Sequence, residues 1–517
     1  MTARDGVMLV AVVAALGASV LAAVRWLRVA QREHYLPGSA TRFAARWWLG
    51  FGPNRLLGAA AVVGVALSPI SPVAAIAAAL AISVGPFRLS LRGRAPGKLV
   101  WTARLRRLAA VTALLVIVPV GAAALLGAAV PVSALAALIA PVLVDLGCMV
   151  TAPIEDRLAG RFVEQASARL HKVAPTVVGI TGSYGKTSTK VYAAHLCAAA
   201  KRVVPSPASF NNRAGLSRAI NEHLSPGTEV FLAEMGTYGP GEIRALCSWC
   251  PPRIAAITAI GPVHLERFGS EEAVLSAKSE IFEAASVAVL NVDDPRLAAV
   301  AAAQERAGLR VWRCSSIDSA ADVCSRRDGE KLVVTYRGEP LATVDDPAAQ
   351  AGNVAVAVAI ALEVGVAGDL VARALASLPQ VANRQAVTPL SSGAVAIDDT
   401  FNANPAGSRA ALATLSRLAR LGGQKVVVTP GMVELGPRQA EENAALGAAL
   451  ADVATHVIVV GWTNRPALLA GLARATNPAA VRVLAVDTRD QAVAWVRANT
   501  AEGDVVLYEN DLPDHYP

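Results

Sequence analysis

The sequence predicts an α-helical membrane region followed by two α/β domains, and three observations support this architecture. The 517-residue chain is strongly apolar, with a mean hydropathy of +0.44, and 17% of its residues are charged, against about 25% in soluble proteins. Residues 1–150 carry a net charge of +11, whereas the remainder carries −3. After residue 176, short apolar runs alternate with Ala-rich stretches. This composition excludes a disordered chain and a small disulfide-stapled protein.

The N-terminal third contains three long stretches with few charged side chains, which predict about five membrane spans. Residues 6–24 hold no charge, and their 19 positions suffice for one span. The 32 uncharged residues 56–87 contain Pro69 near their middle, which favours a helical hairpin. Residues 108–154 carry one charge and fit two spans broken near Pro131.

Two basic segments set the expected orientation of these spans. Arginine and lysine side chains gather in residues 25–55 and again in residues 88–107, between uncharged runs. Such loops face the cytoplasm, so we expect an external N-terminus and a cytoplasmic location for everything after residue 155. Nucleic acid is not an expected partner, because the basic residues flank membrane spans. Asp145 is expected near a helix end, with an intramembrane functional role as the alternative.

The remaining residues predict α/β structure with a mainly parallel sheet, because buried parallel strands appear as short apolar runs separated by helices. A second boundary is expected near residues 380–385, because the apolar runs beyond it fit the strands of another α/β domain. We therefore expect a membrane region at 1–155, a central nucleotide-binding domain at 156–383, and a smaller Rossmann-like α/β domain at 384–517. The strands are expected at Val177–Ile180, Val230–Leu232, Ile254–Ile257, Val287–Leu290, Val395–Ile397, Lys425–Val428, Val457–Val460, Val483–Val486 and Val505–Leu507.

A glycine-rich loop that ends in Gly-Lys-Thr follows the first of these strands. Glycines such as Gly182 and Gly185 let backbone N–H groups close around phosphates, and the following helix adds its positive end. Lys186 is expected to reach the β- and γ-phosphates, with the hydroxyl of Thr187 on Mg²⁺ and Ser188 beside it. The strict pattern has glycine where this chain has Ile180. The strand–loop–helix context nevertheless predicts a nucleotide site.

Three further constellations follow apolar runs. Glu234 stands at the end of a strand downstream of the glycine-rich loop, where a Mg²⁺ ligand is expected. His264 lies in a loop between a strand and a helix, and alone would more often be structural. Asp398 and Asp399 end another strand; such acids bind a ribose or a cation, or belong to an Asx-rich turn.

In this order and spacing, the motifs resemble the Mur ligase family, and most closely its members that add D-alanyl-D-alanine to a UDP-N-acetylmuramoyl tripeptide. The resemblance covers residues 176–510, and the ordered set is far more specific than any one motif. The residues that carry it, besides the glycine-rich loop, are Asn211-Asn212-Arg213-Ala214-Gly215, Glu234-Met235-Gly236, His264-Leu265-Glu266-Arg267-Phe268-Gly269-Ser270, Ala277-Lys278, Asn291-Val292-Asp293-Asp294 and Asp398-Asp399-Thr400-Phe401-Asn402-Ala403-Asn404-Pro405.

The resemblance implies an ATP-dependent amide ligase that works through an acyl phosphate. It implies that Lys186 and Thr187 hold phosphate and Mg²⁺ and that Glu234 binds a first Mg²⁺. His264 would bind a second Mg²⁺ together with Lys278, carried as an N-carboxylated lysine. A carbamate converts an ammonium into an oxygen ligand suited to Mg²⁺.

The resemblance also implies the remaining nucleotide and substrate contacts. Asn291 is expected near the adenine, Arg384 near the phosphates with a catalytic role, and Asp399 at the ribose. The substrate candidates are Asn211, Asn212, Asn402 and Asn404, of which the first two are expected near the reacting groups.

Several departures leave the two substrates open. The membrane third stands where the family has a domain for the uridine diphosphate sugar. In the C-terminal domain, the family's G-D-M motif lacks its acid at Pro430-Gly431-Met432, and its K-G-S-R motif is replaced by Tyr508-Glu509-Asn510-Asp511. The tyrosine of the family's D-D-x-Y motif is replaced by Phe401, and its H-N-x-x-N motif is changed at residues 352–356. From the resemblance we expect an acceptor like a muramoyl peptide and an amine that is an amino acid or a dipeptide. The departures leave open whether the acceptor is a soluble small molecule or is lipid-linked.

The first interpretation is a multi-pass protein of the bacterial cell membrane, with cytoplasmic catalytic domains that act in peptidoglycan precursor synthesis. A ligase for another envelope polymer, such as poly-γ-glutamate, is one alternative. A catalytically inactive nucleotide-binding membrane scaffold is the other, and retention of Lys186, Glu234 and Lys278 argues against it.

Overall fold

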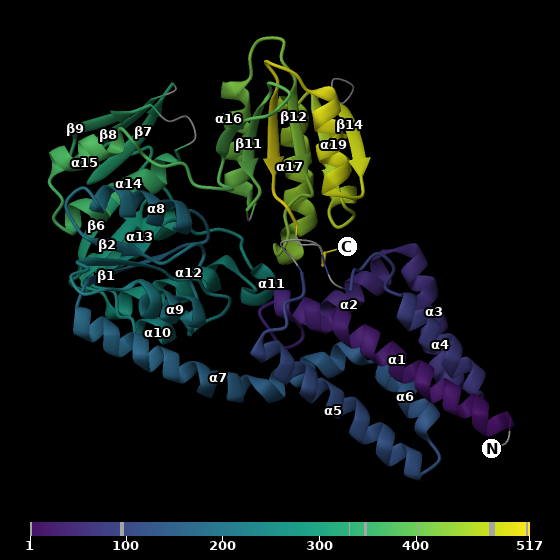
Figure 1. Cartoon of the computed structure of the whole chain (residues 1–517). Helices are drawn as coiled ribbons and strands as arrows, with labels where there is room; N and C mark the ends of the chain where they lie inside the picture. Colours follow the sequence, from purple (N-terminus) through teal and green to yellow (C-terminus); the bar gives the residue numbers. More distant parts are fainter. Residues whose placement is uncertain are drawn as a thin grey trace. The chain divides into compact units, whose positions relative to one another are not determined.

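The computed structural model divides into two compact units, which are described separately (Figure 1). The helical unit contains Met1–Ala159 and Leu512–Pro517, and the α/β unit contains Gly160–Asp511. The structure describes residues 3–516 except 92, 94–97, 330, 346–348, 402, 475–480 and 513–514.

The helical unit is built from long apolar helices. The predicted hairpin is present, because one helix ends at Leu67 and the next begins at Pro72, where the hydroxyl of Ser71 accepts the N–H of Ala74. The predicted break near Pro131 lies at residues 126–128. The helices are α1 (Ala3–Arg32), α2 (Ser39–Gly50), α3 (Gly52–Leu67), α4 (Pro72–Val84), α5 (Ala103–Leu125), α6 (Ala129–Leu138) and α7 (Ala140–Val173).

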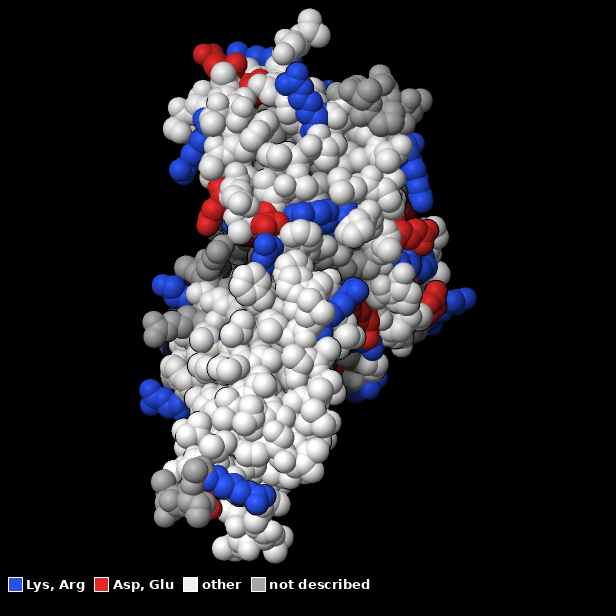
Figure 2. All heavy atoms as spheres, turned by 90° about the vertical axis from the view of Figure 1, so that its right-hand side faces the viewer, with Lys and Arg blue, Asp and Glu red and all other residues white. Residues whose placement is uncertain are grey.

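The described part of the chain contains two helices that are long and apolar enough to cross a membrane, within α1 and α5. The pairs α2–α3 and α6–α7 are bent by 111° and 76°, and counting each pair as one span gives up to four. The expected five spans are therefore not confirmed. Apolar side chains such as Val13, Val63 and Ile117 are exposed on these helices. A broad area of one face carries no Lys, Arg, Asp or Glu (Figure 2).

Asp145 has a structural role at a helix end. Its carboxylate accepts the backbone N–H groups of Ala40 and Thr41 at 3.1 and 2.9 Å, and the hydroxyl of Thr41 at 2.6 Å. These N–H groups belong to the first turn of α2, which has no intrahelical acceptors for them. A carboxylate there satisfies the donors and interacts favourably with the helix dipole.

The central domain of the α/β unit contains a nine-stranded sheet in the order β2-β3-β1-β4-β5-β6-β7-β8-β9. Strands β2 to β7 pair in parallel, and β7, β8 and β9 form an antiparallel extension. The strands are β1 (Thr176–Thr181), β2 (Val203–Pro205), β3 (Val230–Glu234), β4 (Ile254–Ile257), β5 (Val287–Asn291), β6 (Arg310–Ser315), β7 (Val323–Asp328), β8 (Lys331–Tyr336) and β9 (Glu339–Val344).

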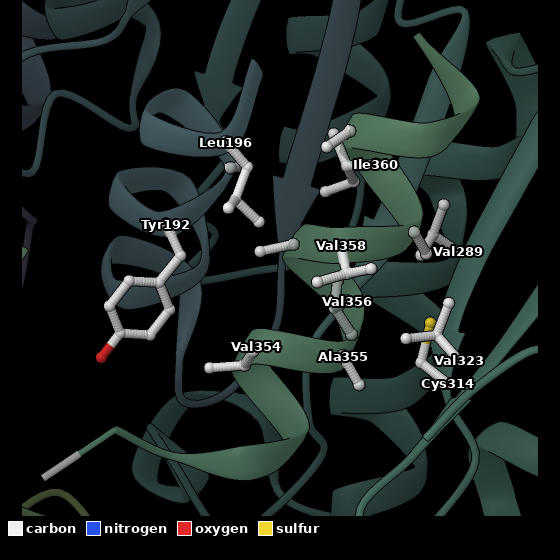
Figure 3. Packing of buried hydrophobic residues seen from close by; sticks show 14 of the residues in the cluster. Tyr192, Leu196, Val289, Cys314, Val323, Val354, Ala355, Val356, Val358 and Ile360 are labelled. Atoms are coloured by element: carbon white, nitrogen blue, oxygen red, sulfur yellow. The ribbon is translucent and has the colours of Figure 1, made fainter. Parts of the chain in front are cut away.

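Helices cover both faces of this sheet. The almost wholly buried helix α14 packs against α8 and against strands β5 to β7, with Val356, Val358 and Ile360 among its contacts (Figure 3). A second buried cluster lies on the opposite face. The helices are α8 (Lys186–Cys197), α9 (Arg213–His223), α10 (Glu242–Cys247), α11 (Leu265–Phe268), α12 (Glu271–Ser279), α13 (Pro295–Arg306), α14 (Ala351–Glu363) and α15 (Gly368–Leu375), with a 3₁₀ helix η1 (Glu280–Ala284).

The C-terminal domain contains a six-stranded sheet in the order β10-β11-β15-β12-β13-β14, in which β10 alone pairs antiparallel among the described strands. All nine predicted strands of the α/β unit are present. The elements are β10 (Ala386–Pro389), β11 (Val395–Asp399), β12 (Lys425–Thr429), β13 (His456–Val460), β14 (Arg482–Val486), β15 (Val505–Glu509), α16 (Pro405–Leu418), η2 (Gly436–Arg438), α17 (Gln439–Val453), α18 (Arg465–Leu472) and α19 (Arg489–Asn499).

Candidate active site

The glycine-rich loop joins β1 to the N-terminus of α8, as the sequence predicts. Gly182 and Gly185 have φ angles of 149° and 78°, which other residues rarely adopt. A Cβ atom at Gly185 would lie 2.2 Å from Oδ1 of Asn353, so the loop also needs glycine for close packing. Lys186 donates to the carbonyl of Gly182, a residue of the same loop, at 2.7 Å. Loop and ammonium therefore fit an anionic phosphate chain.

The residues that follow β4 form hydrogen bonds with this loop. The N–H of Ser183 donates to the carbonyl of Ala259 at 2.7 Å, and its hydroxyl accepts the N–H of Gly261 at 3.1 Å. The hydroxyl of Thr258 donates to the carbonyl of Tyr184. These contacts fix the loop conformation before any ligand binds.

Glu234, at the end of β3, is the centre of a buried polar cluster. Its side chain is 1% exposed and its Oε2 accepts from the hydroxyl of Thr187 and from the ammonium of Lys190, both at 3.0 Å. Its Oε1 accepts from the amide of Asn211 at 3.1 Å. Lys190 also donates to the carbonyl of Ala208 at 2.5 Å. The cluster thus connects α8, β3 and the loop that carries Asn211.

The electrostatics of this cluster keep the carboxylate ionised. Burial acts to raise the pKa of Glu234, but the ammonium groups of Lys190 and Lys186 and the hydrogen bonds outweigh it and hold the pKa below its usual range. Loss of water contact lowers the pKa of Lys186 to about 8, and the charge of Arg384 adds to this effect. An ionised carboxylate beside a hydroxyl, next to a phosphate-binding loop, is a suitable pair of Mg²⁺ ligands. Thr187 and Glu234 therefore fit this ion.

Lys278 lies in α12 and is 2% exposed. Burial, together with the charge of Lys186, lowers its pKa well below the usual value. An amine must be neutral to react with carbon dioxide, so this environment suits the expected carbamate.

The structure places His264 in contact with Glu434, a residue of the C-terminal domain. Its Nδ1 is hydrogen-bonded to the carboxylate of Glu434, and the N–H of Leu265 donates to the carbonyl of Glu434 at 3.1 Å. Its ring also contacts Tyr238, with the ring centroids 4.8 Å apart. Within the described ranges, no three His, Cys, Asp or Glu side chains are grouped so that they could hold a metal ion.

Asn291 lies at the end of β5 and faces an open cavity of about 530 Å³. Its Oδ1 accepts the N–H of Asp293 at 3.2 Å, which holds the loop at the cavity wall. The size of the cavity suits a nucleobase or sugar. The lining residues are Ala259, Ile260, Asn291, Asp293, Asp294, Pro295, Arg296 and Leu297.

Arg384 and Asp399 come together at the carboxyl edge of the second sheet. Burial lowers the pKa of Arg384, whereas the charges of Asp399 and Glu234 oppose this shift. Burial and the neighbouring Glu509 raise the pKa of Asp399 to about 7. The guanidinium of Arg384 stacks on the ring of Phe401, with 4.6 Å from Cζ to the centroid. Arg384 is therefore positioned by both an acid and an aromatic ring.

The asparagine candidates have different environments. Asn211 contacts Glu234, whereas Asn212 caps α9 by accepting the N–H of Gly215 at 2.9 Å. Asn404 caps α16 in the same way, through the N–H of Gly407 at 2.8 Å. Asn402 lies outside the described residues. Ser188 is buried in the first turn of α8.

Four residues of the site were not singled out as functional from the sequence. Lys190 stands four positions after Lys186 in α8, a spacing that places both on one helix face and could have identified it. Asn353 and Glu509 lie in segments that the sequence marks only as departures from the family's motifs, and their contacts with the site, like that of Glu434, depend on tertiary structure.

Comparison with known proteins identifies the family. Residues 180–361 match the Mur ligase middle domain, and residues 383–508 match the Mur ligase glutamate ligase domain. A UDP-N-acetylmuramoyl-tripeptide–D-alanyl-D-alanine ligase of Mycobacterium leprae is 33% identical over 67% of this chain and 73% of its own length. The Escherichia coli protein of that name is 29% identical over 62% and 71%.

The fold agrees with these matches. The structure of a MurF ligase from Thermotoga maritima in complex with ADP is 25% identical, with a TM-score of 0.58 over 68% of this chain and 80% of that one. The two family matches together cover most of both α/β domains. The chain therefore belongs to the Mur ligase family, whose members are ATP-dependent ligases that form carbon–nitrogen bonds in peptidoglycan synthesis.

Proposed function

We propose that this chain is a membrane-anchored ligase that joins the carboxylate of a muramoyl-peptide-like acceptor to the amine of an amino acid or dipeptide. The observation that carries the proposal is the buried cluster of Thr187, Lys190 and Asn211 around the ionised Glu234, next to the loop of Lys186. The relatives named above, which add D-alanyl-D-alanine to a UDP-linked tripeptide, support this substrate class.

The chemistry requires ATP as a substrate. The acceptor carboxylate attacks the γ-phosphorus, ADP leaves, and an acyl phosphate forms; the amine then attacks the acyl carbon and phosphate leaves. Lys186 stabilises the charge on the phosphate oxygens during transfer, because a preorganised ammonium costs no reorganisation in the transition state. When bound to Thr187 and Glu234, Mg²⁺ would neutralise the charge shared by the β- and γ-phosphates.

Lys278 is proposed to carry a carbamate formed from its neutral amine and carbon dioxide, with release of one proton. The carbamate would convert this neutral amine into an anion and provide an oxygen ligand for a second Mg²⁺. His264 was predicted to share that ion. Its hydrogen bond to Glu434 supports a second role, which is to orient the loop that precedes α11.

The nucleotide contacts are proposed to extend across both domains. Asn291 and the cavity beside it are assigned to the adenine, Arg384 to the phosphates, and Asp399 to the ribose. Asn211 is assigned to the reacting groups because its amide already contacts Glu234. The proposals for Asn212, Asn402 and Asn404 rest on the family motifs alone.

The helical unit is proposed to cross the bacterial cell membrane several times, with the catalytic domains in the cytoplasm. The apolar helices α1 and α5 and the basic segments between the spans support this topology. A reporter fused after residue 155 is expected to be cytoplasmic, and one inserted near Pro131 external. The opposite pattern would refute the topology.

The acceptor is proposed to be lipid-linked, since several spans are more than an anchor needs and one helix already inserts stably. The test compares UDP-linked and lipid-linked muramoyl peptide in detergent, with amine-dependent ADP release as the measurement. Equal use of the soluble substrate would contradict a lipid-linked acceptor. Absence of amine-dependent ADP release with every acceptor would instead support an inactive scaffold, and activity with a glutamate polymer alone would support a ligase for another envelope polymer.

A further inference from the structure

The segment that follows β15 belongs to the helical unit, although it is joined directly to the C-terminal α/β domain. We call residues 512–517 the tail segment; residues 512, 515 and 516 of it are described. Segments beyond the last element of a domain are usually poorly ordered unless specific contacts hold them. The contacts of this one are therefore informative.

His515 is held by two polar contacts in the helical unit. Its Nε2 lies 3.0 Å from Oε1 of Glu33, the residue that follows α1. Both side chains are buried, with 2% of His515 and 8% of Glu33 exposed. Its carbonyl oxygen accepts the indole N–H of Trp47 in α2 at 2.8 Å. A buried carboxylate and a buried indole N–H both need such partners, since leaving either group without one is costly.

Aromatic packing adds to these hydrogen bonds. The ring of Phe43 in α2 lies 4.8 Å from the ring of His515 and 4.9 Å from that of Tyr516, the latter in an edge-to-face arrangement. Phe43 and Trp47 belong to the main apolar cluster of the helical unit, and Tyr516 packs against that cluster. His515 and Tyr516 thus pack with the core of this unit.

The other side of the junction is also fixed. Asp511, the last residue of the α/β unit, pairs with Arg489 at 2.5 Å, and the amide of Asn510 donates to the carbonyl of Gly431 at 2.6 Å. Three residues separate Asp511 from His515. A short link between two fixed points gives the tail a high effective concentration at its site.

From this arrangement we infer that the tail segment is a second attachment of the ligase to the membrane helices, in addition to the covalent connection through α7. The tail segment binds a surface formed by Glu33, Phe43 and Trp47. It binds through the side chains of His515 and Tyr516. The attachment holds the C-terminal domain, whereas α7 holds the central domain. This inference does not depend on the substrates or on catalysis.

The test uses the full chain with a protease site inserted between Ala159 and Gly160, where α7 passes from one unit to the other. After cleavage in isolated membranes, the ligase fragment is expected to remain in the membrane pellet. In the variant His515→Ala with Tyr516→Ala, release into the supernatant is expected to rise by at least about tenfold. Trp47→Phe, which removes one hydrogen bond and keeps the ring, should give a smaller increase.

The matched control is His223→Ala, which changes an exposed histidine of α9 and should leave the fragment in the pellet. The inference is wrong if the wild-type ligase fragment is released as readily as the fragment of the double variant. It is also wrong if both fragments stay in the membrane pellet to the same extent. Thermal unfolding of the released fragment, unchanged by the tail substitutions, shows that release does not result from misfolding.

Discussion

The carboxyl edges of the two sheets both carry acidic side chains, but the surroundings of these acids are opposite. At the edge of the nine-stranded sheet, Glu234 is hydrogen-bonded to Lys190, and its pKa is held low. At the edge of the six-stranded sheet, Asp399 and Glu509 are paired in register on β11 and β15, and the pKa of each is raised. Glu509 is 1% exposed and accepts hydrogen bonds from hydroxyl groups, which are neutral donors.

The difference shows that the position of an acid at a strand end does not determine its function. An ionised carboxylate with adjacent ammonium groups is ready for a cation and a phosphate together. Burial raises the pKa of both carboxyl groups at the second edge, and the charge of Glu509 raises that of Asp399 further. A carboxyl group that retains its proton near neutral pH can donate a hydrogen bond to a hydroxyl such as that of a ribose. The predictions below test this contrast, beginning at the first edge.

The largest effect is expected for Lys186→Ala. The ammonium acts where negative charge develops during phosphoryl transfer, so its removal should lower the rate of amide formation by about 10²–10³-fold. ADP release and product formation, measured together, check this. Lys201→Ala, which changes a lysine on the protein surface, is the control and should have little effect. Near-normal turnover of Lys186→Ala would refute the proposed phosphate site.

The next effect concerns Lys278. Lys278→Ala should reduce activity by about 10²-fold if its carbamate binds metal. Short carboxylates such as formate or acetate should restore part of the activity, because they place an oxygen ligand in the space left by the side chain. A crystal structure that shows an unmodified Lys278 side chain in the fully active enzyme would contradict this prediction.

A smaller effect is expected for Lys190, because it positions Glu234 without touching the substrate. Lys190→Met should lower activity by about tenfold and the free energy of unfolding by about 3–5 kcal/mol, the usual cost of leaving one partner of a buried ion pair alone. With Glu234→Gln already present, the same substitution should cost less, and denaturant unfolding of the four proteins measures this coupling. Additive costs would show that the pair is not coupled.

Much of the fold can be predicted from short-range sequence patterns. The apolar run before Glu234 predicts β3, and Pro69 predicts the turn between α3 and α4. The sequence does not predict strands β7 to β9, because they contain no long buried apolar run: several of their positions are exposed or half-buried, and β7 carries Arg326 and Arg327. Their turns contain Asp328-Gly329 and Arg337-Gly338, and the first of these pairs is a recognised hairpin signal that would have indicated them.

The number of spans and the contacts of His264 required the tertiary structure. The uncharged stretches predict five spans, but α4 has 13 residues and α6 has 10, fewer than the roughly 20 that a straight span needs. Charge patterns do not reveal where an apolar stretch bends. Likewise, Glu434 is 170 residues from His264 in the sequence, so their hydrogen bond could not be inferred from spacing.

The smallest effect is expected at the second edge, for Asp399→Asn. The pKa of Asp399 is about 7 in the folded protein and about 4 in the unfolded chain, so the folded state binds more protons between these values. Its contribution to stability is therefore complete below about pH 4 and is lost as the pH rises through about 7. In Asp399→Asn, the fall in unfolding free energy from pH 5 to pH 8 should be smaller by about 1–3 kcal/mol.

Glu234→Gln provides the matched comparison for this last measurement. The pKa of Glu234 is lowered by folding, so its contribution is present above the unfolded pKa and is lost as the pH falls through the lower folded value. Between pH 5 and pH 8 the glutamine variant should therefore keep the wild-type pH dependence while losing stability uniformly. Thermal unfolding of both variants across this range measures the slopes. If the two substitutions change the slope equally, the acids at the two edges do not differ in protonation, and the contrast between the sheets is wrong.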